Sequence, residues 1–255
     1  MTATDGLPAR VAPMIGAAGA AFYFVPETLA SGREIGLDGF RFYFLGRGGV
    51  LGDVEAPVVA SAFGYFEPGL VAHMWDTARE HVAPRDAGRA HLRCAHALGR
   101  ARLSGADGLG AYCAAARAVI AAADPAGLAL FAGMLGEPVP DDLPARAMHL
   151  TVVLRELRGS AHLLAVRASG LSPRVAHFLR RPKDFALFGW KDGDVPEVGD
   201  DERRRLSGAD ALTDDLLGPA FGALDDGGAA ALVEGLGAIA AGLDLGVGTA
   251  RPTAG

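Results

Sequence analysis

Cysteine is nearly absent from this chain: only Cys94 and Cys113 occur among 255 residues. Two thiols so far apart exclude a disulfide-rich scaffold, and each is expected to be a small buried side chain. His91, Cys94 and His96 have a spacing that suggests a metal site. On a helix, however, His96 points away from the other two, and no carboxylate joins them. We therefore expect no metal and no cofactor.

Long apolar runs are also missing. No stretch of about eighteen residues is free of charges and helix breakers, which argues against a transmembrane helix. Residues 1–10 lack the basic region, apolar block and cleavage site of a signal peptide. These absences predict a cytoplasmic protein without a membrane partner.

Positive charge is in deficit, with a net charge of −6 at pH 7. This net charge argues against non-specific electrostatic binding of nucleic acid, although a local basic patch could still exist. We expect a small-molecule ligand or substrate as the partner, and no nucleic acid. The sequence leaves open a homodimer.

Aromatic residues make up only 7% of the chain, whereas half of it is hydrophobic, mostly alanine, leucine and valine. This composition favours packed helices over a β-sandwich. Periodicity and helix-capping residues predict helices near 11–31, 56–79, 84–103, 109–123 and 143–168, with an interruption at Glu67-Pro68. The expected fold is mainly α, with at most a short hairpin beyond residue 183.

The chain changes character near residue 183, where glycine and charged residues become dense. We expect a helical small-molecule-binding domain over residues 1–182. A smaller, degenerate winged-helix-like segment would follow over residues 183–245, with helices near 210–218 and 228–243. The remaining residues, 246–255, are expected to be a disordered tail.

The segment 143–168 carries the most informative pattern. On a helix, one face collects apolar residues, namely Leu150, Leu154, Leu157, Ala161 and Leu164. The nearly opposite face collects Met148, Thr151, Arg155, Arg158 and His162. This second face is either an ordinary solvated surface or a site for an anion or carboxylate.

Arg47 is unusual because it stands alone among aromatic and small residues. The surrounding Gly46, Gly48 and Gly49 do not form a phosphate loop, since the required lysine and serine or threonine are missing. A buried or half-buried arginine needs a carboxylate or carbonyl partner. Arg47 is therefore either a structural clamp or a ligand contact.

These residues lead to a site hypothesis. His162 beside two arginines should have a lowered pKa and could act as a general base. Glu156 should pair with an arginine before it touches a ligand. We expect His162, Arg155 and Arg158 as catalytic residues converging with Arg47 on one cavity, whose remaining binding residues are Tyr23, Tyr65, Trp75 and Glu156.

Several segments occur in a familiar order: 36–40, 43–47, 51–54, 63–68 and, far downstream, 154–162 (LRELRGSAH). Together they resemble an actinobacterial group of mostly helical proteins known as SalK-like or helix-turn-helix family proteins. The resemblance covers about residues 15–190, with a weaker similarity over 205–243. It implies a mainly helical fold and a role in secondary metabolism, and its label describes shape more than DNA binding.

The chain departs from that family at two places. The family's first helix carries a glutamate and a histidine where this chain has Gly16 and Gly19, although Tyr23 remains. The family also often has a histidine where this chain has Leu157. The site is thus either altered to accept a larger, more apolar ligand or lost.

Three classes of function remain. The first is a small-molecule-binding protein of natural-product biosynthesis, which could be a cofactor-independent cyclase, isomerase or lyase. The second is a ligand-responsive helix-turn-helix regulator, and the third is a non-catalytic interaction protein. The C-terminal segment argues against DNA binding, because helices 210–218 and 228–243 contain no lysine or arginine and Arg203-Arg204-Arg205 follow three acidic residues.

Overall fold

A computed structural model describes residues 4–245 and contains no strand in that range. The mainly α prediction is confirmed. The α-helices are α1 (Leu7–Ala20), α2 (Pro26–Glu34), α3 (Gly39–Gly48), α4 (Ala56–Phe63), α5 (Pro68–Arg79), α6 (Pro84–Leu103), α7 (Leu109–Ala122), α8 (Ala129–Met134), α9 (Leu143–Ala168), α10 (Pro173–Arg180), α11 (Asp200–Phe221) and α12 (Asp226–Gly242). Short 3-10 turns cover Gly49–Leu51, Pro182–Asp184, Ala186–Phe188 and Asp192–Asp194.

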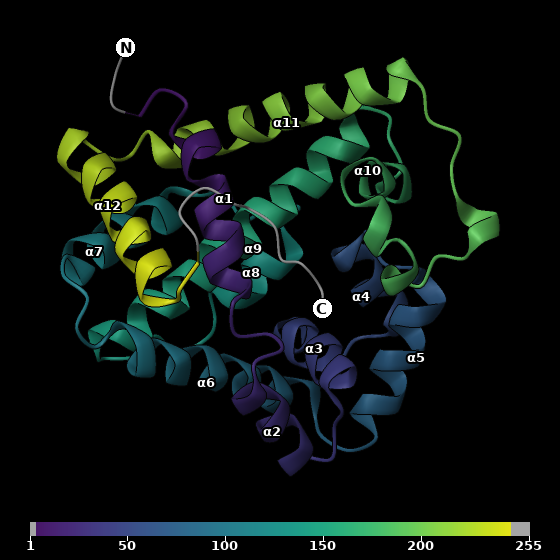
Figure 1. The fold of residues 1–255 in the computed structure, drawn as a ribbon, viewed down its shortest axis with the longest axis horizontal. Coiled ribbons are helices and arrows are strands. Elements are labelled where there is room, and N and C mark those ends of the chain that lie inside the picture. The colour runs from purple at the N-terminus through teal and green to yellow at the C-terminus, as the bar shows by residue number, and fades with distance from the viewer. Residues whose placement is uncertain (1–3, 246–255) are drawn as a thin grey trace.

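Helix α9 is the centre of the molecule. It packs against α6, α11, α1, α7 and α8, and Figure 1 shows it between α11 on one side and α6 on the other. The Asp142 side chain caps its first turn by accepting a hydrogen bond from the Ala145 backbone N–H at 3.1 Å. A central position makes this helix the frame on which side chains from several other helices converge.

The predicted helix over 11–31 is wrong in its continuity, since the chain forms two helices, α1 and α2. Val25 is extended because the following Pro26 disfavours the helical conformation before it. Gly19 of α1 lies so close to α9 that a Cβ there would stand 2.8 Å from Arg155 Cβ. The small residues of α1 thus serve a close helix–helix approach.

Residues 39–48 form the helix α3, and the 3-10 turn Gly49–Leu51 follows it directly. Asp38 caps it by accepting a hydrogen bond from the Arg41 backbone N–H at 2.9 Å. Gly46 lets α3 pack closely on α6, because a Cβ at Gly46 would lie 2.6 Å from the Cβ of His91. This close contact places Arg47 beside the interior of the molecule.

The possible hairpin beyond residue 183 is wrong: residues 182–194 instead contain three short 3-10 turns. Helices α11 and α12 share the main apolar core through side chains such as Leu217, Phe221, Leu232 and Ile239. The core therefore runs across the boundary expected at residue 182, and the division into two domains stays a prediction. The tail expected over 246–255 lies outside the described residues.

None of the helices within residues 4–245 combines the length and hydropathy that a membrane span requires. Within the same residues, no group of three or more histidine, cysteine or acidic side chains has a metal-binding arrangement. Cys94 and Cys113 are both buried free thiols, as expected.

Candidate functional site

Helix α9 has buried residues on both of its predicted faces between Ala145 and Leu157. Met148 and Thr151, from the expected polar face, are fully buried, whereas Leu164 from the apolar face is 44% exposed. The interpretation as a solvated helix face is wrong, because neighbouring helices surround α9. Its charged side chains must therefore find partners inside the protein.

Glu156 provides that partner for two arginines. Its Oε1 and Oε2 accept hydrogen bonds from Arg47 Nε and Nη2 at 2.9 and 2.8 Å. Arg155 Nη1 donates a further bond to Oε1 at 2.8 Å. The Glu156 side chain is 3% exposed, against 13% for Arg47 and 24% for Arg155. The expectation that Glu156 holds an arginine is confirmed.

Aromatic rings cover both guanidinium groups. Arg47 Cζ lies 4.5 Å from the ring centre of Phe63, and its Nη1 donates to the Tyr43 hydroxyl at 3.3 Å. Arg155 Cζ lies 5.0 Å from the ring centre of Tyr23. These cation–π contacts hold the two arginines in fixed orientations.

Tyr23 and His91 have polar atoms without hydrogen-bond partners beside Arg47, Arg155 and Glu156. The Tyr23 hydroxyl and His91 Nε2 are buried without a hydrogen-bond partner, and the two rings stack with centres 5.5 Å apart. Burial raises the pKa of Tyr23. Burial and, secondarily, Arg47 lower the pKa of His91 to about 3. Tyr23 is therefore protonated and His91 neutral at pH 7.

Tyr23, Arg47, His91 and Glu156 line a small cavity of about 10 Å³. That volume corresponds to about one water molecule. We call these four residues together with Arg155 the Arg47 cluster. His91 is the member that sequence reasoning missed as a site residue, because it drew attention only through its spacing to Cys94 and His96.

The Arg47 cluster carries an excess positive charge. Burial alone would raise the pKa of Glu156, but Arg47 and Arg155 lower it to about 2, so the carboxylate is ionised. Two guanidinium groups then face one carboxylate and a neutral imidazole. No further carboxylate pairs with either arginine in the described part of the chain. The cluster thus has a net charge of +1 in a largely buried setting.

His162 belongs to a different group of side chains. Its Nδ1 lies 3.0 Å from the Thr213 hydroxyl and 3.9 Å from an Asp210 oxygen. Thr213 donates its own proton to the Ala209 carbonyl at 2.6 Å, so His162 Nδ1 must be the donor and its Nε2 the unprotonated atom. Burial, and then Arg158, lower the pKa of His162 to about 4, in the predicted direction.

We call Tyr65, Arg158, His162, Asp210 and Thr213 the His162 cluster. Several of its polar atoms are buried without a partner: the Tyr65 hydroxyl, Arg158 Nε and one Asp210 oxygen. Arg180 pairs with the other Asp210 oxygen. This arrangement joins α9 to α10 and α11.

The predicted single site is therefore divided. Arg47, Arg155, Glu156 and Tyr23 meet in the Arg47 cluster, whereas Arg158, His162 and Tyr65 belong to the His162 cluster. Trp75 enters neither group, because it is fully buried and its Nε1 donates to the Val54 carbonyl at 3.0 Å. Arg155 and Arg158 lie almost one turn apart on α9, and different side chains surround them: Arg155 lies over Tyr23, whereas Arg158 lies near Asp210 and Asp214 of α11.

Helices α4 and α5 are joined by residues 64–67 and pack against each other. The fully exposed residues of α5 are Pro68, Gly69, His73 and Asp76. Arg79 of the same helix pairs with Asp53, Glu55 and Asp76, at 3.3–3.7 Å. This surface lacks the free cations that a DNA-reading helix uses.

Comparison with known proteins gives one result. The model of the family described as "Helix-turn-helix family" matches residues 9–187, which is more than half of the chain. No curated protein and no solved structure matches. The matched range includes every residue of the Arg47 cluster and ends before α11. The chain belongs to the Helix-turn-helix family.

Proposed function

We propose that this protein binds a small organic anion, such as a carboxylic acid, at the Arg47 cluster. One observation carries the proposal: two arginines share one carboxylate, and the Tyr23 hydroxyl and His91 Nε2 beside them have no partner. An uncompensated buried charge is costly unless a counter-charge joins it. A bound carboxylate supplies that charge by pairing with Arg155, and it can accept a hydrogen bond from the Tyr23 hydroxyl.

Access to the cluster lies beside α1. The Arg155 side chain is 24% exposed, and a Cβ at Gly16 would meet nothing within 4 Å. Gly19 is in direct contact with Arg155, and Gly16 lies three residues earlier on the same helix. The acidic group of a ligand would reach Arg155 from this side, and its remainder would lie along the small residues of α1.

The proposal extends to catalysis without a cofactor. The bound acid group would orient the rest of the ligand for a cyclisation, an isomerisation or a lyase reaction, whereas His91, whose pKa is lowered to about 3, is too weak a base to remove a carbon-bound proton. The resemblance to SalK-like proteins supports a place in actinobacterial natural-product biosynthesis. His162, the base expected from sequence, would act only on a ligand that reaches the second cluster.

A panel of small carboxylic acids and their neutral amides tests the binding. At 100-fold excess over Kd, a ligand stabilises the protein by about 2.7 kcal/mol, or about 5–10 °C in Tm. We expect at least one acid, and not its amide, to produce such a shift. Arg155→Gln should abolish it, since the Arg47–Glu156 pair that remains is neutral. Arg117→Gln, at an exposed arginine of α7, is the matched control.

A ligand-responsive regulator is the second candidate, because the family is described as helix-turn-helix. The same anion would then change the affinity for DNA rather than be converted. A gel-shift with the protein's own upstream region, with and without the best acid of the panel, separates the two functions. Ligand-dependent specific binding supports the regulator, and conversion of the acid supports the enzyme.

A further inference from the structure

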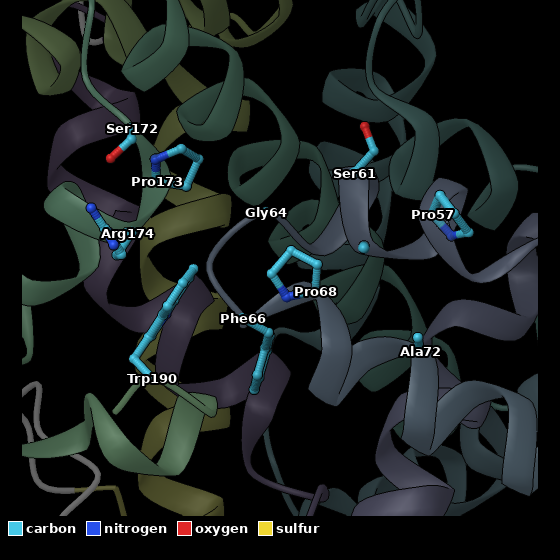
Figure 2. A pocket seen from close by; sticks show the side chains of 11 residues that line it. Pro57, Ser61, Gly64, Phe66, Pro68, Ala72, Ser172, Pro173, Arg174 and Trp190 are labelled. Carbon is cyan, nitrogen blue, oxygen red and sulfur yellow. The ribbon is translucent and has the colours of Figure 1, made fainter. Parts of the chain in front are cut away.

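A groove with no residue of either cluster in its lining lies between α4, α5, the start of α10 and Trp190 (Figure 2). Its volume is about 570 Å³, within the range of small-molecule sites. We call it the Trp190 groove. The lining is largely apolar and includes Phe66, Pro68, Ala72, Pro173, Arg174 and Trp190.

The wall of the groove is fixed in place. Trp190 Nε1 donates a hydrogen bond to the Tyr65 carbonyl at 2.9 Å. The Glu67 backbone N–H donates to the Phe188 carbonyl at 2.8 Å, and the ring of Phe188 stacks on Phe66 with centres 4.1 Å apart. These contacts tie the loop after α10 to the α4–α5 turn. The groove is preformed, which lowers the cost of ligand binding.

Arg174 is the charged residue among the side chains that line the groove. Its Cζ lies 5.6 Å from the ring centre of Trp190, and no carboxylate pairs with it within residues 4–245. Figure 2 shows Arg174 and Trp190 on one side of the space and Pro57, Ser61 and Ala72 on the other. An unpaired guanidinium beside an aromatic ring is suited to a ligand with an acidic group next to a flat apolar body.

We propose that the Trp190 groove is a second binding site, for a flat apolar molecule that carries one acidic group. The body of the ligand packs on Trp190 and the apolar wall, and its acid group pairs with Arg174. The Arg47 cluster cannot bind the same ligand, because its cavity of about 10 Å³ is too small for an aromatic ring. The two sites therefore select different ligands, and neither proposal depends on the other.

Titration with 2-naphthoate and with its neutral amide, 2-naphthamide, tests this site by calorimetry. We expect saturable one-to-one binding of naphthoate and binding of the amide that is about three to ten times weaker. Arg174→Gln should weaken naphthoate to the level of the amide and leave the amide unchanged. Ser61→Trp should abolish the binding of both, because Ser61 is an exposed residue whose enlargement fills the groove without disturbing the core.

Two controls keep this test separate from the proposed function. Arg155→Gln should leave naphthoate affinity unchanged, and Arg117→Gln should do the same. The inference is overturned if wild type shows no saturable binding at about 1 mM, or if naphthoate tolerates both Arg174→Gln and Ser61→Trp. A loss caused by Arg155→Gln alone would place the ligand at the Arg47 cluster instead.

Discussion

At the scale of single residues, we expect the substitution of Glu156 to lower the free energy of unfolding most, because Glu156 is the one carboxylate shared by Arg47 and Arg155. Glu156→Gln keeps the shape but leaves two guanidinium groups without a counter-charge. We expect a loss of about 3–5 kcal/mol in the free energy of unfolding. Urea denaturation monitored by circular dichroism measures it.

Arg155→Gln is the comparison for that variant. It leaves the neutral Arg47–Glu156 pair intact, so its loss should be clearly smaller than that of Glu156→Gln. Equal losses would show that the excess charge is not the feature that matters in this cluster.

The two glycines of α1 offer a matched pair of substitutions. Gly19→Ala should destabilise the protein by about 1–3 kcal/mol, since the new Cβ would stand 2.8 Å from Arg155 Cβ. Gly16→Ala should stabilise it by about 0.5–1 kcal/mol, because the added methyl meets nothing and alanine favours the helix. Thermal unfolding of both variants checks this, and a stabilising Gly19→Ala would contradict the close α1–α9 packing.

Residue chemistry made part of the site predictable. An isolated Arg47 requires a carboxylate, and Glu156 among arginines was expected to supply a pair, which it does across 109 positions. The sequence could not show that Arg155 and Arg158 belong to different clusters. Their separation depends on which helices pack beside α9, and that is decided by the whole core rather than by helical spacing.

At the scale of elements, helices α4 and α5 do not present a DNA-binding surface. The exposed residues of α5 include Asp76 but no free cation. On α11, Arg204 and Arg205 pair with Asp201, at 3.2 and 2.8 Å. We predict no sequence-specific DNA binding. A gel-shift at about 0.1 M salt checks this, because specific regulators bind at roughly 10⁻⁸ M or tighter.

Most helices could be predicted from their ends. Pro84 and Pro173 stand in the first turns of α6 and α10, and Asp142 caps α9. The break between α1 and α2 was harder to predict. Apolar residues run through both segments, so periodicity alone did not locate Val25 as the point where the chain becomes extended.

At the scale of the whole molecule, five of the seven histidines are held neutral by burial. The pKa of His91 is lowered to about 3, and the pKa values of His96, His149, His162 and His177 to about 4. His96 and His149 also form a pair, with Nε2 and Nδ1 3.1 Å apart. Such a pair resists taking up two protons.

These pKa shifts determine how the free energy of unfolding changes with pH. The unfolded chain takes up protons on histidine near pH 6.5, whereas the folded protein resists until about pH 4. The free energy of unfolding should therefore fall as the pH drops from about 6.5 to about 4, by about 1 kcal/mol per histidine for each pH unit. Urea unfolding at a series of pH values measures the slope.

His149→Gln should reduce that slope, because it removes one histidine of the buried pair. His73→Gln, at an exposed position of α5, is the control and should leave the slope in place. Constant stability between pH 7 and pH 5 would contradict the neutral state of these five side chains.

The central claim, that the Arg47 cluster binds a small organic anion, is tested most directly by native mass spectrometry. The protein is loaded with the acid that gives the largest Tm shift, and the bound mass is compared in wild type, Arg155→Gln and Arg174→Gln. The account predicts one bound acid in wild type and Arg174→Gln, and none in folded Arg155→Gln. An acid that remains on Arg155→Gln, or that leaves with Arg174→Gln, would contradict it.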